Sequence, residues 1–295
     1  MSAEPFDKAL LERQRARWSR EGQEPPLFLA RHVAEDLAER LSLVQRRFDA
    51  GLDLGGDGGE CARAVEATGQ VGRLLRLRPG PQDGAVDDPV GDIEALPVEP
   101  ESFDLVVSNL ALHLTNDTPG TLVQVRRALR PDGLFLGTML GGETLHELRA
   151  ALIAAETEIS GGASPRVLPF AELRDAGGLL QRAGFALPVI DQDRLTIRYD
   201  TMFQLMADIR AMGGANVLLA RSRRPVSRRL FLRAAEIYAQ RFSDADGRVR
   251  ATFDVIHLSG WRPHESQQKP LPRGSAKMRL ADALGVRERT GEEPF

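Results

Sequence analysis

Residues 52–60 read LDLGGDGGE, in which a short apolar stretch runs directly into a glycine-rich turn. The following stretch, ECARAVEATG, is rich in helix-forming residues and ends at Gly69. A strand, a glycine turn and a helix in this order are typical of a doubly wound sheet, where the turn binds a ligand beyond the carboxyl end of the strand. Glycine permits positive φ angles and a close approach of the backbone to that ligand. A turn that serves only packing remains the alternative.

Strand and helix patterns continue to alternate after this turn. Apolar runs at 71–77, 103–107 and 133–140 predict strands, and the run at 103–107 is typical of a strand buried on both faces. Apolar residues at helical spacing between Pro119 and Pro131 predict a helix. The alternation predicts an α/β fold with a doubly wound, mostly parallel sheet.

Helical patterns also cover the start and the last third of the chain. Helices are expected at 142–158 and 170–184, a strand or hairpin at 185–199, and a last strand at 251–261. The expected organisation is a helical lead-in at 1–45, a core at 46–200 and 246–264, a helical insertion at 201–245 before the last strand, and a tail at 265–295.

The composition excludes several classes of function. The 39 basic and 42 acidic residues give a net charge of -3, so the overall charge of the protein does not attract nucleic acid. The single cysteine, Cys61, excludes an internal disulfide framework and a thiolate zinc cage. No apolar run reaches the roughly 18 residues of a membrane helix, and residues 1–20 lack the apolar region of a signal peptide. We expect a cytoplasmic protein with no integral membrane segment and no nucleic-acid partner.

The glycine turn does not fit a dinucleotide site. Counting from Gly56 through Gly58 puts Cys61 at the final position of GxGxxG. The spacing of residues 53–59 instead resembles the D-x-G-x-G-x-G turn of class I S-adenosylmethionine (SAM) dependent methyltransferases, which have a Rossmann-like fold. Three further stretches resemble later motifs of that superfamily: GDIEALP at 91–97, FDLVVSN at 103–109 and LRPDG at 129–133.

This resemblance implies that SAM is the cofactor. It assigns cofactor contacts to the turn, to the segment whose acid contacts the adenine amino group, and to the end of the fourth strand. The residues concerned are Asp53, Gly55, Gly56, Asp57, Gly59, Asp92, Ile93 and Asn109.

The sequence departs from the superfamily pattern in two places. Asp57 stands where the pattern has its middle glycine, and aspartate tolerates a left-handed conformation better than most residues. The acid that binds both ribose hydroxyls would fall at Leu77 or Arg78, neither of which accepts hydrogen bonds. Its loss could weaken SAM binding by about one to two powers of ten. Three acids of the next loop could bind the ribose instead, namely Asp83, Asp87 and Asp88. We favour the simpler interpretation that they are solvent-exposed residues of a turn.

From Phe6 to Ala276, the chain resembles the methyltransferase-like assembly factors of respiratory complex I, described in mitochondria as protein arginine hydroxylases. The most specific match is the closing block, which includes Gly260-Trp261, His264-Glu265-Ser266-Gln267 and Arg273-Gly274-Ser275-Ala276. The resemblance implies a protein substrate, namely an arginine of the iron-sulfur subunit that joins the two arms of complex I. It also implies a place at the periphery of that membrane-bound complex.

Two residues are candidates for catalysis. His113 follows the fourth strand, where a general base could act, and a histidine bound to a backbone carbonyl is an equal alternative. Glu143 follows two glycines at the start of a helix and could face a guanidinium. Alternatively, its negative charge could simply stabilise the N-terminus of the helix by interacting with the helix dipole. The sequence contains no 2-His-1-carboxylate spacing, so no metal site is expected.

Hydroxylation and methylation of the arginine both remain open at this point. Two other functions remain as alternatives. One is a non-catalytic assembly chaperone with a degenerate SAM site, which the departures at Asp57 and Arg78 favour. The other is a methyltransferase of the biotin-pathway type that esterifies a carrier-bound carboxylate, because that branch shares the core motifs and the helical insertion.

Overall fold

The computed structural model describes residues 4–20, 28–55, 58–79 and 87–268. The chain divides into two compact units, Met1–Pro263 and His264–Phe295. The first unit contains every helix and strand described below, and the second is described only at residues 264–268. Gly56, Asp57 and Asp83 lie outside the described residues.

Six strands form one sheet within the described residues, in the order β2-β1-β3-β4-β6-β5. The four parallel strands are β1 (Phe48–Asp53), β2 (Val71–Arg76), β3 (Phe103–Ser108) and β4 (Leu129–Leu140). The two antiparallel strands are β5 (Ala186–Tyr199) and β6 (Val249–Trp261). The predicted mostly parallel sheet is confirmed. The segment expected to be a strand or a hairpin is the single long strand β5.

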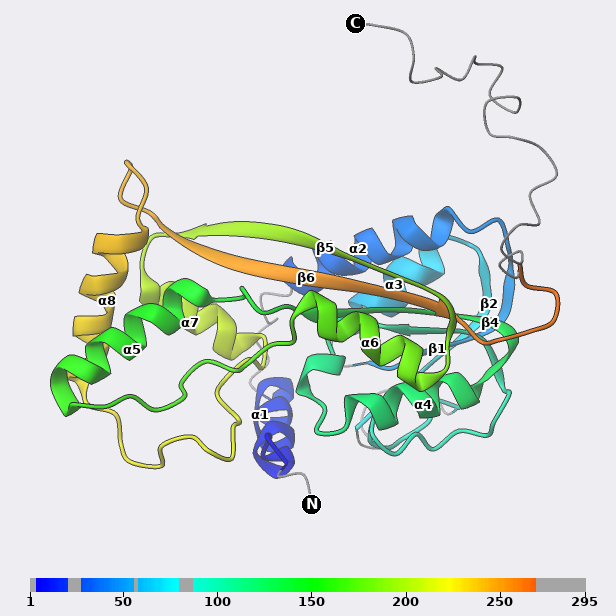
Figure 1. Cartoon of the computed structure of the whole chain (residues 1–295), viewed down its shortest axis with the longest axis horizontal. Helices are drawn as coiled ribbons and strands as arrows, with labels where there is room; N and C mark the ends of the chain where they lie inside the picture. Colours follow the sequence, from blue (N-terminus) through cyan, green and yellow to red (C-terminus); the bar gives the residue numbers. More distant parts are fainter. Residues whose placement is uncertain (1–3, 21–27, 56–57, 80–86, 269–295) are drawn as a thin grey trace, which may run out of the picture. The chain divides into compact units, whose positions relative to one another are not determined.

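Helices cover both faces of the sheet (Figure 1). One face is covered by α2 (Phe28–Ser42) and α3 (Glu60–Ala67), and the other by α4 (Thr118–Ala128) and α6 (Leu173–Ala183). The alternation along β3 explains this arrangement, because Leu105 packs against the first pair of helices and Val106 against the second. All six residues of β3 are buried, as predicted for 103–107, although Asp104 and Ser108 are polar.

The helix expected before Pro131 ends at Ala128, and the next strand begins at once. Leu129 is fully buried and pairs with Phe103, so the chain joins the sheet before it reaches Pro131. Burial of one large apolar side chain contributes about 2 kcal/mol, which outweighs the local helical preference of this turn. The register shifts between Phe103 and Leu105, where the extra residues of β4 are accommodated.

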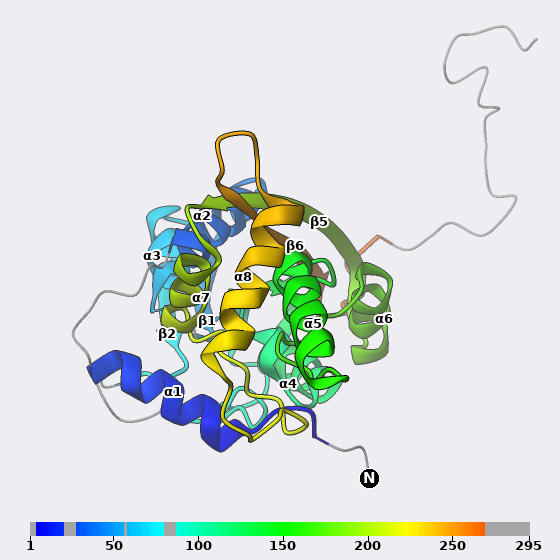
Figure 2. The same ribbon diagram turned by 90° about the vertical axis from the view of Figure 1, so that its left-hand side faces the viewer.

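Three more helices pack on the distant ends of β5 and β6, as Figure 2 shows from that side. They are α5 (His146–Ser160), α7 (Met202–Ala211) and α8 (Arg228–Phe242). Tyr199, Ala251 and Phe253 of the strands share a buried cluster with these helices. The helices α7 and α8 lie between β5 and β6 in the chain, within the segment 201–245.

The carboxyl ends of β1, β2, β3 and β4 meet at one edge of the sheet because these strands are parallel. An N-terminal segment that leads into α1 (Lys8–Arg20) lies among loops that follow this edge. Phe6 and Leu11 share an apolar cluster with Leu168 and Leu218, against which Leu114 of the short 3-10 helix η1 (Leu112–Leu114) also packs. The fold thus gathers four distant segments near the edge where a ligand is expected.

Candidate cofactor and substrate site

The glycine turn begins with a buried acid. Asp53 is fully buried at the end of β1, and its Oδ1 accepts a hydrogen bond from the Gly55 amide at 3.0 Å. Gly55 has a φ of +70°, and a Cβ there would lie 2.4 Å from the Leu77 carbonyl oxygen. Both facts require glycine at this position, since no side chain fits between the turn and the end of β2. Asp53 therefore sets the direction of the turn.

The second half of the turn opens α3. Gly58 and Gly59 have φ angles of 73° and 90°, and Gly59 is the N-cap residue of the helix. A Cβ on Gly59 would lie 2.6 Å from a guanidinium nitrogen of Arg76, so this side chain lies against the turn. The described part of the turn has the left-handed backbone and the close approaches that a nucleotide-binding turn needs.

The end of β2 does not offer a free carboxylate. Leu77 is buried in the core, and the Arg78 guanidinium lies 3.5 Å from Asp88. The other oxygen of Asp88 accepts a hydrogen bond from the Arg76 amide at 3.0 Å. Only 10% of the Asp88 side chain is exposed, so the expectation of a solvated turn residue is wrong for Asp88. The same expectation is correct for Asp87, which forms an exposed ion pair with Arg73.

The predicted adenine-contacting acid is held by the N-terminus of α1. Asp92 Oδ2 lies 2.8 Å from the Lys8 ammonium, and Asp92 Oδ1 accepts a hydrogen bond from the Glu94 amide at 3.0 Å. Glu94 also contacts Lys8 and accepts a hydrogen bond from the Asp117 amide at 2.6 Å. Ile93 packs against the core cluster beneath the edge. Sequence reasoning missed Lys8, because no local pattern connects it with Asp92.

Asn109 follows β3 at the same edge, but its side chain faces inward. It is fully buried, donates to the Ala30 carbonyl at 2.8 Å and accepts from the Thr138 hydroxyl at 3.0 Å. The amide therefore connects β3 with α2 and β4. A contact with a cofactor at this position would have to come from the main chain.

The two catalytic candidates lie on segments that follow adjacent strands. His113 is in η1, with Nδ1 3.5 Å from the Leu140 amide and its ring centroid 5.7 Å from that of Phe170. The Glu143 side chain is 55% exposed, and its amide donates to Asp254 at 3.2 Å. The His113 ring thus lies beside the carboxyl end of β4, whereas Glu143 is fixed there by its main chain and its side chain is open to solvent.

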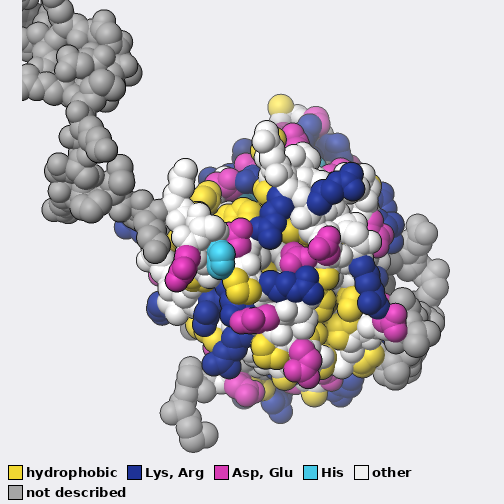
Figure 3. All heavy atoms as spheres, turned by 90° about the vertical axis from the view of Figure 1, so that its right-hand side faces the viewer, with side chains coloured by type: hydrophobic (Ala, Val, Ile, Leu, Met, Phe, Trp, Pro, Cys, Tyr) yellow, Lys and Arg dark blue, Asp and Glu magenta, His cyan; other side chains and the backbone are white. Residues whose placement is uncertain are grey.

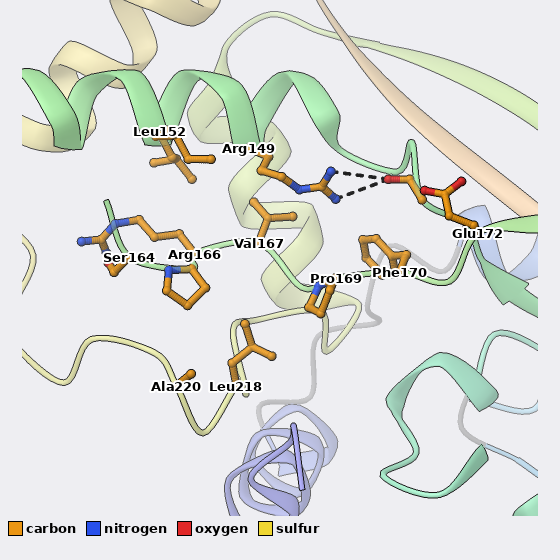
Figure 4. Close-up of a pocket in the computed structure, with 13 residues that line it drawn as sticks. Arg149, Leu152, Ser164, Arg166, Val167, Pro169, Phe170, Glu172, Leu218 and Ala220 are labelled. Carbon is orange, nitrogen blue, oxygen red and sulfur yellow. Dashed lines mark hydrogen bonds between the residues drawn. The ribbon is translucent and has the colours of Figure 1, made fainter. Parts of the chain in front are cut away.

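A cavity of about 550 Å³ lies next to this edge (Figure 4). It is bounded by α5, by the segment 164–172 before α6, and by Leu218 and Ala220. Its charged lining residues are Arg149, Arg166 and Glu172. Composition and periodicity did not predict this cavity, because its walls come from three segments separated by long stretches of chain.

Comparison with known proteins agrees with this fold. Residues 59–137 match the family model described as "Methyltransferase domain". A structure from Bacillus halodurans described as a methyltransferase shares the fold, with a TM-score of 0.53 and 18% identity over 78% of this chain and 99% of its own. "Arginine-hydroxylase NDUFAF5, mitochondrial" of Rattus norvegicus is 37% identical over 287 residues, covering 94% of this chain and 83% of the relative. The chain belongs to the NDUFAF5 arginine-hydroxylase family.

A second group of relatives is more distant from this family member. "Malonyl-[acyl-carrier protein] O-methyltransferase" of Halorhodospira halophila is 33% identical over 273 residues, covering 88% of this chain and 89% of the relative. The resemblance to the complex I assembly factors and the wider resemblance to methyltransferases are therefore both confirmed at the level of family.

Away from the edge, this NDUFAF5 family member brings together Asp36, Asp193 and His257, whose ligand atoms lie within 4.8 Å of one another. The guanidinium of Arg40 contacts both carboxylates, at 2.9 Å from Asp36 and 3.0 Å from Asp193. Burial, and next the Arg40 charge, lower the pKa of His257. Arg40 thus supplies the positive charge that this acidic pair requires.

The face of the molecule in Figure 3 carries Lys and Arg side chains interspersed with Asp and Glu. Charges of one sign do not gather into a single patch among the described residues on that face. Within the described part of the chain, no helix combines the length and the apolar character needed to span a bilayer.

Proposed function

We propose that this protein modifies an arginine of a respiratory complex I subunit during assembly of the complex, with SAM bound at the glycine turn. The observation that carries the proposal is the 37% identity over 94% of the chain to proteins named arginine hydroxylases. The partner we propose is the iron-sulfur subunit that joins the peripheral and membrane arms. The protein would act at the periphery of the membrane-bound complex.

The described residues of the turn fit a SAM site in part. Gly55 and Gly59 have the left-handed backbone of such a turn, with φ angles of 70° and 90°, and Asp53 fixes the turn through the Gly55 amide. We propose that these three residues hold SAM together with Gly56 and Asp57, and that Asp92 and Ile93 lie beside the adenine. When bound there, SAM would supply an electrophilic methyl group for transfer. The Arg78–Asp88 pair stands where a ribose-binding acid would be, which supports a weakened site.

The chain's own residues would position the arginine and handle its protons. Methylation requires the guanidinium to lose one proton, and His113 or Glu143 would accept it at this edge. Hydroxylation replaces a hydrogen with a hydroxyl group and so requires an oxidant as well. The two outcomes differ by one added methylene or one added oxygen, which mass spectrometry separates.

The decisive experiment compares a gene deletion with its parent. The proposed iron-sulfur subunit is purified from both, and the mass of each arginine-containing peptide is measured. We expect one arginine to carry a modification in the parent that disappears in the deletion and returns with the wild-type gene. Identical masses at every arginine in both strains would count against an enzymatic role.

A non-catalytic assembly chaperone is the second candidate, and the engaged Asp88 favours it. In this case complex I assembly would be restored in the deletion by variants that do not bind SAM. A third candidate is methylation of a carrier-bound carboxylate, which the 33% identity to malonyl-carrier methyltransferases favours. Biotin auxotrophy of the deletion strain would bring this candidate forward.

A further inference from the structure

Among the described residues that line the cavity beside α5, Glu172 is a charged group whose side chain makes no hydrogen bond or ion pair. It precedes α6 as the N-cap residue, and its side chain does not cap the helix. Phe170, Pro169 and Val167 form the apolar wall next to it. Figure 4 shows Arg149 reaching from α5 toward the end of the cavity where Phe170 and Glu172 lie.

Glu172 is exposed, and its carboxylate lies close to the main chain of the turn that follows β4. A Cβ on Gly142 would lie 2.4 Å from Glu172 Oε1, so a side chain at Gly142 would displace this carboxylate. Gly142 belongs to the Gly141-Gly142-Glu143 turn, which follows β4 at the carboxyl edge of the sheet. The carboxylate therefore lies beside the Gly142 turn, which also lines the cavity.

The two arginines of the cavity are already engaged. Arg166 forms a two-pronged ion pair with Glu156, at 2.9 Å and 2.5 Å, so their charges cancel. Arg149 donates to the carbonyl oxygens of Gly142, at 3.4 and 3.5 Å, and of Thr144, at 3.2 Å. Arg149 thus binds main-chain carbonyls, whereas Glu172 presents a carboxylate to the cavity.

This arrangement selects a particular kind of ligand. A simple anion is disfavoured by Glu172, and a simple cation is disfavoured by Arg149. A polypeptide with a cationic side chain satisfies both groups, because it offers carbonyl oxygens close to its positive charge. A guanidinium pairs with a carboxylate through two parallel hydrogen bonds, and it also stacks on aromatic faces such as that of Phe170.

We propose that this cavity receives the arginine side chain of the protein substrate, with Glu172 pairing with its guanidinium and Phe170 stacking on it. The inference rests on the proposed function and names the residues that recognise the substrate. The site lies beside the catalytic candidates, since the Phe170 ring is 5.7 Å from that of His113.

The test uses NMR titration of the full-length protein with an acetylated, amidated peptide that has one arginine between glycines. A second peptide carries citrulline, which is the neutral isostere of arginine. We expect the arginine peptide to bind at least about tenfold more tightly than the citrulline peptide. Glu172→Gln should remove this preference, and Phe170→Leu should weaken binding of the arginine peptide severalfold.

Asp175→Asn is the matched control. Asp175 lies in the first turn of the same helix, is exposed, and does not line the cavity. The control removes the same charge from the same helix terminus, and it should leave the preference for arginine intact. Thermal melting of all variants checks that each is folded.

Equal binding of the two peptides to the wild type would overturn the inference, as would an unchanged preference in Glu172→Gln. Titration with malonate tests the alternative that the cavity binds carboxylates. Tight malonate binding that depends on Arg149 would support this alternative and overturn the inference. These outcomes can be separated from failure of the proposed function, which is judged by the mass of the complex I subunit. If the subunit is modified but Glu172→Gln does not change the preference for the arginine peptide, the proposed function remains supported and only this site is overturned.

Discussion

The ammonium group of Lys8 lies 2.8 Å from the carboxylate of Asp92, and this contact joins the first turn of α1 to the loop expected to lie beside the adenine. Neighbouring contacts hold the same N-terminal segment. The Phe6 amide donates to Asn116 at 2.8 Å, and Asp7 forms an ion pair with Arg221 at 3.0 Å. The segment therefore connects the proposed cofactor site with the loop that contributes Leu218 and Ala220 to the cavity beside α5.

Replacing Lys8 with methionine should speed the release of SAM by about two- to fivefold, because a half-exposed ion pair contributes up to about 1 kcal/mol. The dissociation rate can be measured by stopped-flow displacement, and hydrogen exchange should rise at residues 6–11. Lys8→Arg keeps the charge and serves as the control. Slower release from Lys8→Met would show that Lys8 competes with the cofactor for Asp92.

Restoring the ribose-binding acid should require two substitutions. Arg78→Asp alone would place a new carboxylate against Asp88, whose side chain is 10% exposed. We expect it to lower the free energy of unfolding by about 3 kcal/mol, since it breaks a largely buried ion pair. Arg78→Asp combined with Asp88→Asn removes the repulsion, and should bind SAM about tenfold or more tightly than the wild type.

Calorimetric titration with SAM measures this effect, with thermal unfolding recorded for each variant. Asp57→Gly, which restores the other departure from the superfamily pattern, belongs to the same series. If the double variant binds SAM no better than the wild type, the ribose must be bound by another group. Micromolar binding by the wild type would lead to the same conclusion.

Gly55→Ala should be more damaging than Gly69→Ala, although both glycines have a positive φ. Gly69 has a φ of +66°, and a Cβ there would meet no atom within 4 Å, so alanine costs only backbone strain of about 1 kcal/mol. At Gly55 the Cβ would also collide with the Leu77 carbonyl at 2.4 Å. We expect at least about 2 kcal/mol of destabilisation there. Urea unfolding compares the two, and equal losses would mean that the turn moves freely away from β2.

Glu156 should make the stability of the cavity wall depend on pH. Hydrogen bonds from Arg166, supported by the Ser164 amide and hydroxyl, lower the pKa of Glu156 from 4.5 to about 2. Because the folded-state pKa is depressed, the stabilisation is fully present above pH 4.5 and is lost as the pH falls toward 2. It amounts to about 2–3 kcal/mol at neutral pH.

Glu156→Gln removes this contribution, so its difference in unfolding free energy from the wild type should shrink as the pH is lowered. Urea unfolding at neutral pH and in the acid range measures this change. Glu99→Gln, at an exposed position, is the control and should show no such trend. A difference that is the same at both pH values would mean that the ion pair with Arg166 contributes little.

Local sequence patterns were sufficient for the fold and for the position of the glycine turn in it. The mostly apolar run of β3 and the glycine turn after β1 are short-range signals, because strand periodicity and positive φ angles depend on neighbouring residues. The parallel order of the strands then follows from alternation with helices, which brings their carboxyl ends to one edge. Asp53 and Gly55 could therefore be placed at this edge from the sequence.

The sequence alone determined that this chain forms a doubly wound sheet with a glycine turn at the end of its first strand, since these features are encoded within short stretches. Only the tertiary structure decided which charges meet. Lys8 contacts Asp92 across 84 positions, and the Glu172 carboxylate lies close to Gly142 from a different loop. Ion pairs and cavity walls depend on the packing of distant segments, and no periodicity along the chain records that packing.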